Sequence, residues 1–178
     1  MNPAVRLLLP ILLWTMFNPA CAGSSHSSLR VGDSPEAVVL KDAQGHALTL
    51  PDDLKGKVAL VRFWANDCHY CHKELLAGLE ALYLKYKSRG FEPVAIDVGR
   101  PGRGEGRKPA CESCTYPMFD DPVGLAGKRF QIMVLPTTFI LDEKGVVREK
   151  IVGDVDIETL EKLITQVLYK AGFYDGTY

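Results

Sequence analysis

The sequence lacks an excess of charge of either sign. Its 178 residues include 21 Lys and Arg against 22 Asp and Glu, which gives a formal net charge of −1. None of the helices predicted below carries a basic stripe, and clustered basic charge is the usual mark of a nucleic-acid-binding domain. The composition therefore gives no reason to expect a nucleic acid as a partner.

Internal repeats and long apolar runs are also missing. The absence of a repeat excludes a solenoid or propeller. The longest apolar run, Leu7–Phe17, is shorter than the roughly 20 residues that a transmembrane helix needs. Apolar residues make up 47% of the chain and charged residues 24%, values typical of a folded globular protein. The length suits one domain with its own core.

The N-terminal segment has the pattern of an export signal. Arg6 precedes the short apolar run, and the small residues Ala20-Cys21-Ala22 follow it. We therefore interpret residues 1–22 as a signal that is cleaved after Ala22. The alternative is a lipoprotein signal, in which Cys21 carries a lipid and tethers the protein to a membrane. Both interpretations predict a periplasmic or otherwise extracytoplasmic protein, where disulfides persist.

After the signal, residues 23–34 are polar and serine-rich, which is typical of a flexible tether. The remaining 35–172 form the predicted domain. Alternating apolar residues and turn signals predict strands, and apolar residues at helical spacing predict helices. The expected strands cover 37–40 and 46–50 as a hairpin, then 58–64, 91–98, 137–141 and 146–152. The expected helices cover 68–88, 122–130 and a last segment around 160–168. This order predicts an α/β fold with a central mixed sheet and helices on both faces.

The motif Cys68-His69-Tyr70-Cys71 joins the buried strand 58–64 to the first long helix. A cysteine at a helix start lies near free backbone amides and partial positive charge, which favour thiolate over thiol. The second cysteine, about one turn further along, is close enough to form a disulfide with the first. The pattern predicts a redox site.

A second pair, Cys111 and Cys114, follows the glycine-rich and basic segment Gly99–Lys108. That segment is either a solvated surface loop or a basic docking patch. Two thiols this close are expected to pair in an oxidising compartment. The pair is then either a local structural disulfide or a second redox centre, and the sequence leaves both interpretations open.

Residues 35–170 resemble the thioredoxin superfamily, and in particular its exported TlpA/ResA-like branch. The resemblance depends on Phe63-Trp64-Ala65 ahead of the Cys68–Cys71 motif, on Glu74 three residues after it, and on Leu135-Pro136-Thr137-Thr138-Phe139. The implied fold is the thioredoxin-like fold. The implied activity is thiol-disulfide oxidoreduction, in the reductive direction and often in cytochrome c maturation. Protein thiols or disulfides and a membrane electron donor are the implied partners, and no cofactor is expected.

The resemblance also assigns roles to single residues. Cys68 corresponds to the attacking thiolate and Cys71 to the buried resolving thiol. Pro136 corresponds to a proline that follows a cis peptide bond, faces the disulfide and positions a substrate strand. Glu74 corresponds to an acid that relays protons to the cysteine pair. The alternative role of Glu74 is to interact with the dipole of the helix.

The sequence departs from the family pattern at two places. Asp67 stands where relatives have Trp directly before the first cysteine, and a carboxylate there is expected to raise the pKa of Cys68. His69 and Tyr70 occupy the positions that tune the redox potential. The segment between Val98 and Pro122, with its second cysteine pair, replaces a helix of the relatives.

Two metal-binding alternatives use the same cysteines. Cys68-x-x-Cys71-His72 matches the c-type haem attachment pattern, with Met118 or Met133 as a candidate axial ligand. The two cysteine pairs could instead bind one zinc ion. However, 39 residues separate the pairs, more than the 15–20 residues usual in such sites, and we expect no metal. A third alternative is a binding module that uses the first disulfide only as a staple.

Overall fold

The computed structural model describes residues 28–42, 44–71, 74–99 and 111–173. Its centre is β3 (Val58–Trp64), in which every residue is buried. β4 (Phe91–Asp97) pairs with β3 in parallel, and β6 (Thr137–Leu141) pairs with it antiparallel. β5 (Met118–Asp120) and β7 (Val147–Val152) complete the sheet in the order β5-β4-β3-β6-β7. The predicted mixed sheet is confirmed.

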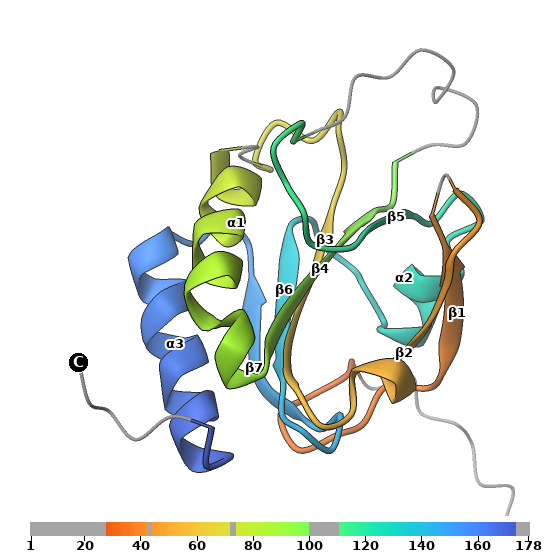
Figure 1. The fold of residues 1–178 in the computed structure, drawn as a ribbon. Coiled ribbons are helices and arrows are strands. Elements are labelled where there is room, and N and C mark those ends of the chain that lie inside the picture. The colour runs from red at the N-terminus through yellow and green to blue at the C-terminus, as the bar shows by residue number, and fades with distance from the viewer. Residues whose placement is uncertain (1–27, 43, 72–73, 100–110, 174–178) are drawn as a thin grey trace, which may run out of the picture.

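Both faces of the sheet are covered (Figure 1). α1 (Glu74–Tyr86) and α3 (Ile157–Lys170) lie on one face. The other face is covered by α2 (Leu125–Arg129) and by a separate hairpin of β1 (Val38–Lys41) and β2 (Ala47–Leu50). Two short 3₁₀ helices connect elements, η1 (Asp52–Leu54) and η2 (Lys87–Arg89). This is the α/β, thioredoxin-like fold that the sequence predicted.

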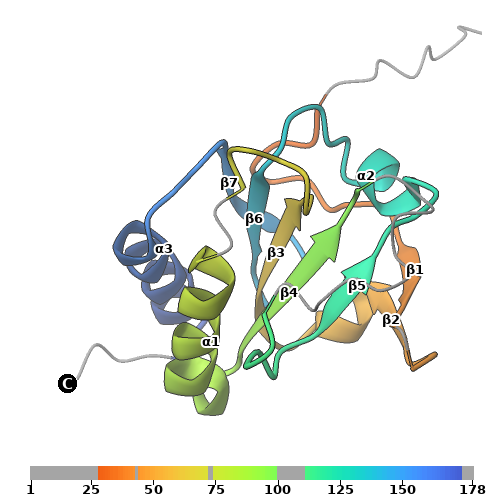
Figure 2. The same cartoon turned by 90° about the horizontal axis from the view of Figure 1, so that it is seen from above.

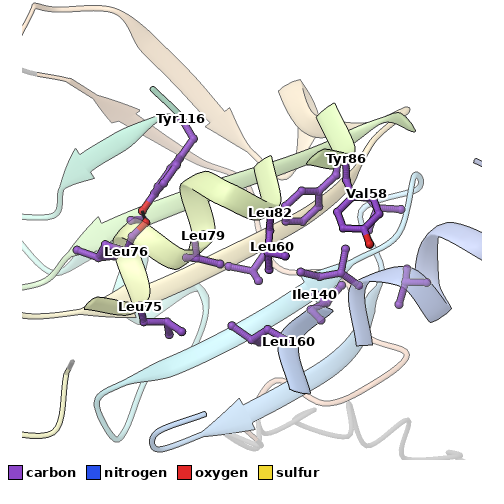
Figure 3. Packing of buried hydrophobic residues seen from close by; sticks show 14 of the residues in the cluster. Val58, Leu60, Leu75, Leu76, Leu79, Leu82, Tyr86, Tyr116, Ile140 and Leu160 are labelled. Carbon is purple, nitrogen blue, oxygen red and sulfur yellow. Dashed lines mark hydrogen bonds between the residues drawn. The ribbon is translucent and has the colours of Figure 1, made fainter. Parts of the chain in front are cut away.

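The sheet separates two hydrophobic clusters, because successive side chains of a strand point to opposite faces. On the helical face, Leu60 and Ile140 pack against Leu79 and Leu160 (Figure 3). On the opposite face, Phe63 packs against Phe130 and Phe139, with ring centroids 5.0 and 6.2 Å away. We call the first the helical-face cluster, and it also contains Cys71.

Local sequence signals set the ends of the helices. The α1–η2 segment ends at Gly90, which has the left-handed backbone φ of 77° that glycine adopts most easily. Asp156 caps α3, and its side chain accepts a hydrogen bond from the Thr159 backbone N–H at 2.7 Å. Gly78 lets the two helices approach, since a Cβ on it would lie 3.0 Å from Ile157.

Residues 28–34 pack on the domain although the sequence analysis placed them in the tether. Leu29 is buried, and the Gly32 N–H donates to the Val147 carbonyl at 2.8 Å. The packing therefore begins ahead of Pro35. The predicted export signal with Cys21, the first part of the tether, and His72 lie outside the described residues. Within the described part of the chain, no helix is long and apolar enough to cross a membrane.

Candidate redox site

Two successive turns carry the chain from β3 to the first cysteine pair. The Cys68 N–H donates to the Ala65 carbonyl at 3.1 Å, and the Cys71 N–H donates to the Cys68 carbonyl at 3.3 Å. These turns bring the two Cα atoms within 5.3 Å, and the sulfurs form a disulfide. Cys68 thus lies in a turn ahead of α1 instead of within its first turn, because the chain turns twice before the helix begins. The helix-terminus argument for a Cys68 thiolate is weaker than the sequence implied.

The two sulfurs differ in their access to solvent. Cys71 is only 5% exposed and belongs to the helical-face cluster, whereas Cys68 is half-buried and lies at its margin. A reagent that approaches from outside therefore reaches Cys68 first. The structure provides the asymmetry that an attacking and a resolving cysteine require.

The predicted tuning residues lie on the solvent side of the pair. Asp67 and His69 are exposed, and Tyr70 is 70% exposed with its ring edge-on to His69 at a centroid distance of 5.3 Å. Glu74 is exposed as the first described residue of α1. The tuning roles and the proton-relay role of Glu74 remain predictions.

Pro136 lies beside the same end of β3. The peptide bond between Leu135 and Pro136 is cis, as the resemblance implied. Because Thr137 pairs with Phe63, Pro136 lies next to the β3 end from which the Cys68 turn begins. The Pro136 carbonyl accepts a hydrogen bond from the Gly153 N–H at 2.8 Å, which fixes this loop to the end of β7.

An apolar cavity of about 740 Å³ adjoins the Pro136 loop. Its walls include Met133, Val134 and Leu135 from the loop and Gly127 from α2. Met133 is 86% exposed and Val134 is 52% exposed. The sequence analysis considered Met133 only as a haem ligand. The apolar run directly before Pro136 was the signal that this surface could bind a substrate.

Arg62 is a second feature that the sequence analysis missed. It is 1% exposed, on the helical face of β3 between Leu60 and Trp64. Its Nη1 donates to Thr138 Oγ1 at 3.0 Å, while Nη2 is buried with no hydrogen-bond partner among the described residues. Burial lowers the pKa of Arg62 to about 10, against the opposing effect of Asp154. A lone arginine within an otherwise apolar strand was the available signal.

The second cysteine pair also forms a disulfide, with a Cα–Cα distance of 5.4 Å. Cys111 and Cys114 are both half-buried and pack against the helical-face cluster. Figure 2 nevertheless separates the two loops. The yellow segment after β3 lies beside the ends of β6 and β7, ahead of the N-terminal end of α1, whereas the green segment before β5 lies alongside α1 on the side of β5. Among the described residues, no three side chains of His, Cys, Asp or Glu are gathered closely enough to hold a metal ion.

Comparison with known proteins identifies the family. Residues 31–150 match the AhpC/TSA family. The chain belongs to the AhpC/TSA family. This family member is 30% identical over 139 residues to a thiol-disulfide oxidoreductase ResA of Bacillus cereus, over 78% of this chain and 79% of that protein. It is 29% identical over 141 residues to ResA of Geobacillus kaustophilus, over 79% and 80% of the two chains.

Solved structures agree with this assignment. The thioredoxin domain of a thiol-disulfide oxidoreductase from Bacteroides vulgatus has a TM-score of 0.63 and 26% identity, over 77% of this chain and 99% of that chain. A candidate thiol:disulfide interchange protein DsbE from Chlorobium tepidum has a TM-score of 0.66 and 26% identity, over 79% and 99%. This AhpC/TSA family member is thus an enzyme of the thiol-disulfide oxidoreductase class, as the sequence predicted.

The zinc alternative does not fit this arrangement. A zinc site of four cysteines needs deprotonated sulfurs gathered around one point. Here each pair forms its own disulfide, and Figure 2 draws the two loops apart. The haem alternative needs His72, which lies outside the described residues, and the family and the fold give it no support.

Proposed function

We propose that the protein is an exported reductase of protein disulfides that acts through Cys68 and Cys71. The observation that supports this assignment is the difference in exposure between the half-buried Cys68 and the buried Cys71. The Cys68 thiolate attacks one sulfur of a substrate disulfide and forms a mixed disulfide. The Cys71 thiolate then attacks the Cys68 sulfur, which releases the substrate as a dithiol and leaves the Cys68–Cys71 disulfide.

The apolar surface beside Pro136 supports a protein as the substrate. Met133 and Val134 present large apolar side chains to solvent next to the cavity, and Tyr70 does so beside the cysteines. Apolar groups of this size on a surface are typical of binding sites. In this proposal Pro136 positions an extended substrate segment next to Cys68, and Glu74 exchanges protons with the pair.

A trapping experiment tests the roles of the two cysteines. In Cys71→Ser the mixed disulfide with a protein substrate should accumulate, because the resolving thiolate is missing. In Cys68→Ser no such complex should form. Peptide mass spectrometry of the trapped complex identifies the bonded cysteine. A complex bonded through Cys71 in the Cys68→Ser protein would show that the roles are reversed.

The direction of electron flow is tested separately. A reductase needs a disulfide with a potential near the reducing end of the thioredoxin-like range, about −270 mV, whereas oxidants lie near −120 mV. Titration of Cys68 and Cys71 against a glutathione series measures this potential. For the cytochrome c maturation role that the resemblance implies, reduction of a Cys-x-x-Cys-His peptide disulfide should be faster than reduction of a matched peptide without the histidine.

The location and the electron donor complete the proposal. An extracytoplasmic reductase must be reduced again from across the membrane, and a membrane protein with its own cysteine pair is the expected donor. Fractionation of cells that express the full chain tests the location. The mass of the mature N-terminus distinguishes cleavage after Ala22 from a lipid on Cys21.

A further inference from the structure

The Cys111–Cys114 disulfide lies in a setting that differs from a simple staple. Cys114 Sγ lies 3.3 Å from the carbonyl oxygen of Leu76, in the first turn of α1. A disulfide sulfur has no proton, so this contact is not a hydrogen bond in the oxidised state. After reduction, the Cys114 thiol can donate to an oxygen that is already in place. The reduced thiol shares this acceptor with the Tyr116 hydroxyl, so it gains a weak contact that the oxidised sulfur cannot make.

The same loop is fixed by contacts that do not need the disulfide. Glu80, which is 8% exposed, accepts two hydrogen bonds of 2.7 Å from Thr115, one from its N–H and one from its Oγ1. The Tyr116 hydroxyl donates to the Leu76 carbonyl at 3.0 Å, and the ring is buried against α1 (Figure 3). Hydrogen bonds to a charged acceptor are stronger than neutral ones. These contacts hold the chain directly after Cys114 whether or not the sulfurs are bonded.

A disulfide between residues three apart also adds little stability. The loop that it closes is very short, and the entropic stabilisation by a disulfide grows with the length of the closed loop. The hydrogen bonds of Glu80 and Tyr116 already hold this loop, and the disulfide adds little stability to them. As a structural bond, the second disulfide is therefore largely redundant.

From these contacts we propose that Cys111 and Cys114 form a second dithiol–disulfide redox site, which exchanges electrons with thiols of another molecule. Cys111 is the sulfur that is attacked, and Cys114 is the leaving sulfur that rests on the Leu76 carbonyl. Each pair forms its own disulfide, and Figure 2 draws the two loops apart, so the proposed exchange partner is a thiol of another molecule. This site works whether or not Cys68 has the role proposed above.

The exchange can be written with glutathione as the probe. A glutathione thiolate attacks Cys111 Sγ, the Cys111–Cys114 bond breaks, and a mixed disulfide forms on Cys111. The Cys114 thiolate takes a proton from water. The resulting S–H group donates a hydrogen bond to the Leu76 carbonyl. A second glutathione thiolate attacks the glutathione sulfur of the mixed disulfide and releases Cys111, which also takes a proton. The pair gains two electrons and two protons, and two glutathiones become one glutathione disulfide.

The test uses two double variants of the full chain. Cys68→Ala/Cys71→Ala keeps only the second pair, and Cys111→Ala/Cys114→Ala keeps only the first. Each protein is equilibrated with a series of glutathione ratios without denaturant, then quenched with acid and alkylated. Peptide mass spectrometry reads the redox state of each cysteine.

In Cys68→Ala/Cys71→Ala we expect one reversible two-electron transition of Cys111 and Cys114 in the native protein. A second pair that stays oxidised across the series, and reacts only after unfolding, would overturn the proposal and assign the disulfide as a staple. A matching readout is the unfolding midpoint of Cys111→Ala/Cys114→Ala, which should remain close to that of the wild type. If the function proposed for Cys68 is wrong, this will be seen only in Cys111→Ala/Cys114→Ala, which keeps the first pair. The experiment therefore distinguishes a failure of that function from a failure of the second redox site.

Discussion

The two cysteine loops share one spacing and differ in nearly everything around it. Their Cα–Cα distances are 5.3 and 5.4 Å, so the disulfides themselves are alike. The first loop extends a fully buried strand, and one of its sulfurs enters the core. The second loop lies on the side of α1, where Glu80 and the Leu76 carbonyl hold it. The spacing determines that a disulfide forms, and the surroundings determine which sulfur a partner can reach.

The largest difference between the loops should appear in turnover on a protein substrate. Cys68→Ser removes the proposed nucleophile, so disulfide reduction with dithiothreitol as donor should fall roughly 100-fold or more, as is usual for the loss of a covalent catalyst. Cys111→Ser should leave most of this turnover intact, because Cys111 is bonded to Cys114 and not to either cysteine of the first pair. Equal losses in the two variants would show that the loops act as one site.

Removal of the Glu80 carboxylate should loosen only the second loop. Glu80→Ala leaves the Thr115 N–H and Oγ1 without their acceptors, and such a loss costs about 1–3 kcal/mol of unfolding free energy. Amide hydrogen exchange should accelerate at residues 111–116 and stay unchanged at 64–71. Glu158→Ala is the matched control, because Glu158 is an exposed helical acid whose ion-pair partner among the described residues is Lys162, and such an exposed pair contributes little to stability. Uniform acceleration in both loops would contradict the prediction.

Each loop also has an exposed acid next to its first cysteine, Asp67 before Cys68 and Glu112 after Cys111. Asp67→Asn should lower the pKa of Cys68, because a neighbouring negative charge opposes the thiolate, and exposure limits the change to less than about one unit. Thiolate absorbance measured against pH gives this value. Glu112→Gln should leave the Cys68 pKa unchanged. A Cys68 pKa that does not fall in Asp67→Asn would mean that the carboxylate points away from the sulfur.

The smallest effect is expected from Asp156, the exposed N-terminal cap of α3, which serves as a baseline. Hydrogen bonds from the Thr159 N–H and Oγ1 lower the pKa of Asp156 below its ordinary value of 3.8. A lowered pKa stabilises the fold above the unfolded-state value and loses that contribution as the pH falls through the folded-state value. Asp156→Ala should therefore unfold at a lower temperature than the wild type at neutral pH. The difference should shrink below about pH 4, and both cysteine pairs should keep their potentials.

Much of the fold was predictable because local signals were strong. The strands β3 and β6 were predicted with their observed bounds, and Gly90 and Asp156 are residue types that capping preferences favour where the structure places them. The packing of residues 28–34 was not predicted, since a polar segment gives no sign that Leu29 is buried in the hydrophobic cluster on the face opposite α1 and α3. The second turn, from Cys68 to Cys71, was also missed, because periodicity locates a helix better than it locates its first residue.

The candidate site was predictable only where a motif marks it. Cys68, Cys71 and Pro136 belong to recognisable local patterns, and the structure places them at one end of the sheet. Glu80 and Thr115 are 35 residues apart, and their contact depends on how the chain returns to α1. Arg62 was predicted as one more residue of a buried strand, and the structure adds that it lies between the sheet and the helices and donates to Thr138.

The order of the strands has a consequence for how the chain acquires its native disulfides. β3 pairs antiparallel with β6, and β6 follows all four cysteines of the two pairs in the sequence. The antiparallel half of the sheet therefore cannot form until these cysteines have been synthesised. Four cysteines can pair in three ways. Each native bond joins residues three apart, and closing so short a loop costs less entropy than a bond between the two pairs. The short spacing thus favours the two native bonds over a bond between the pairs, even before β6 joins the sheet.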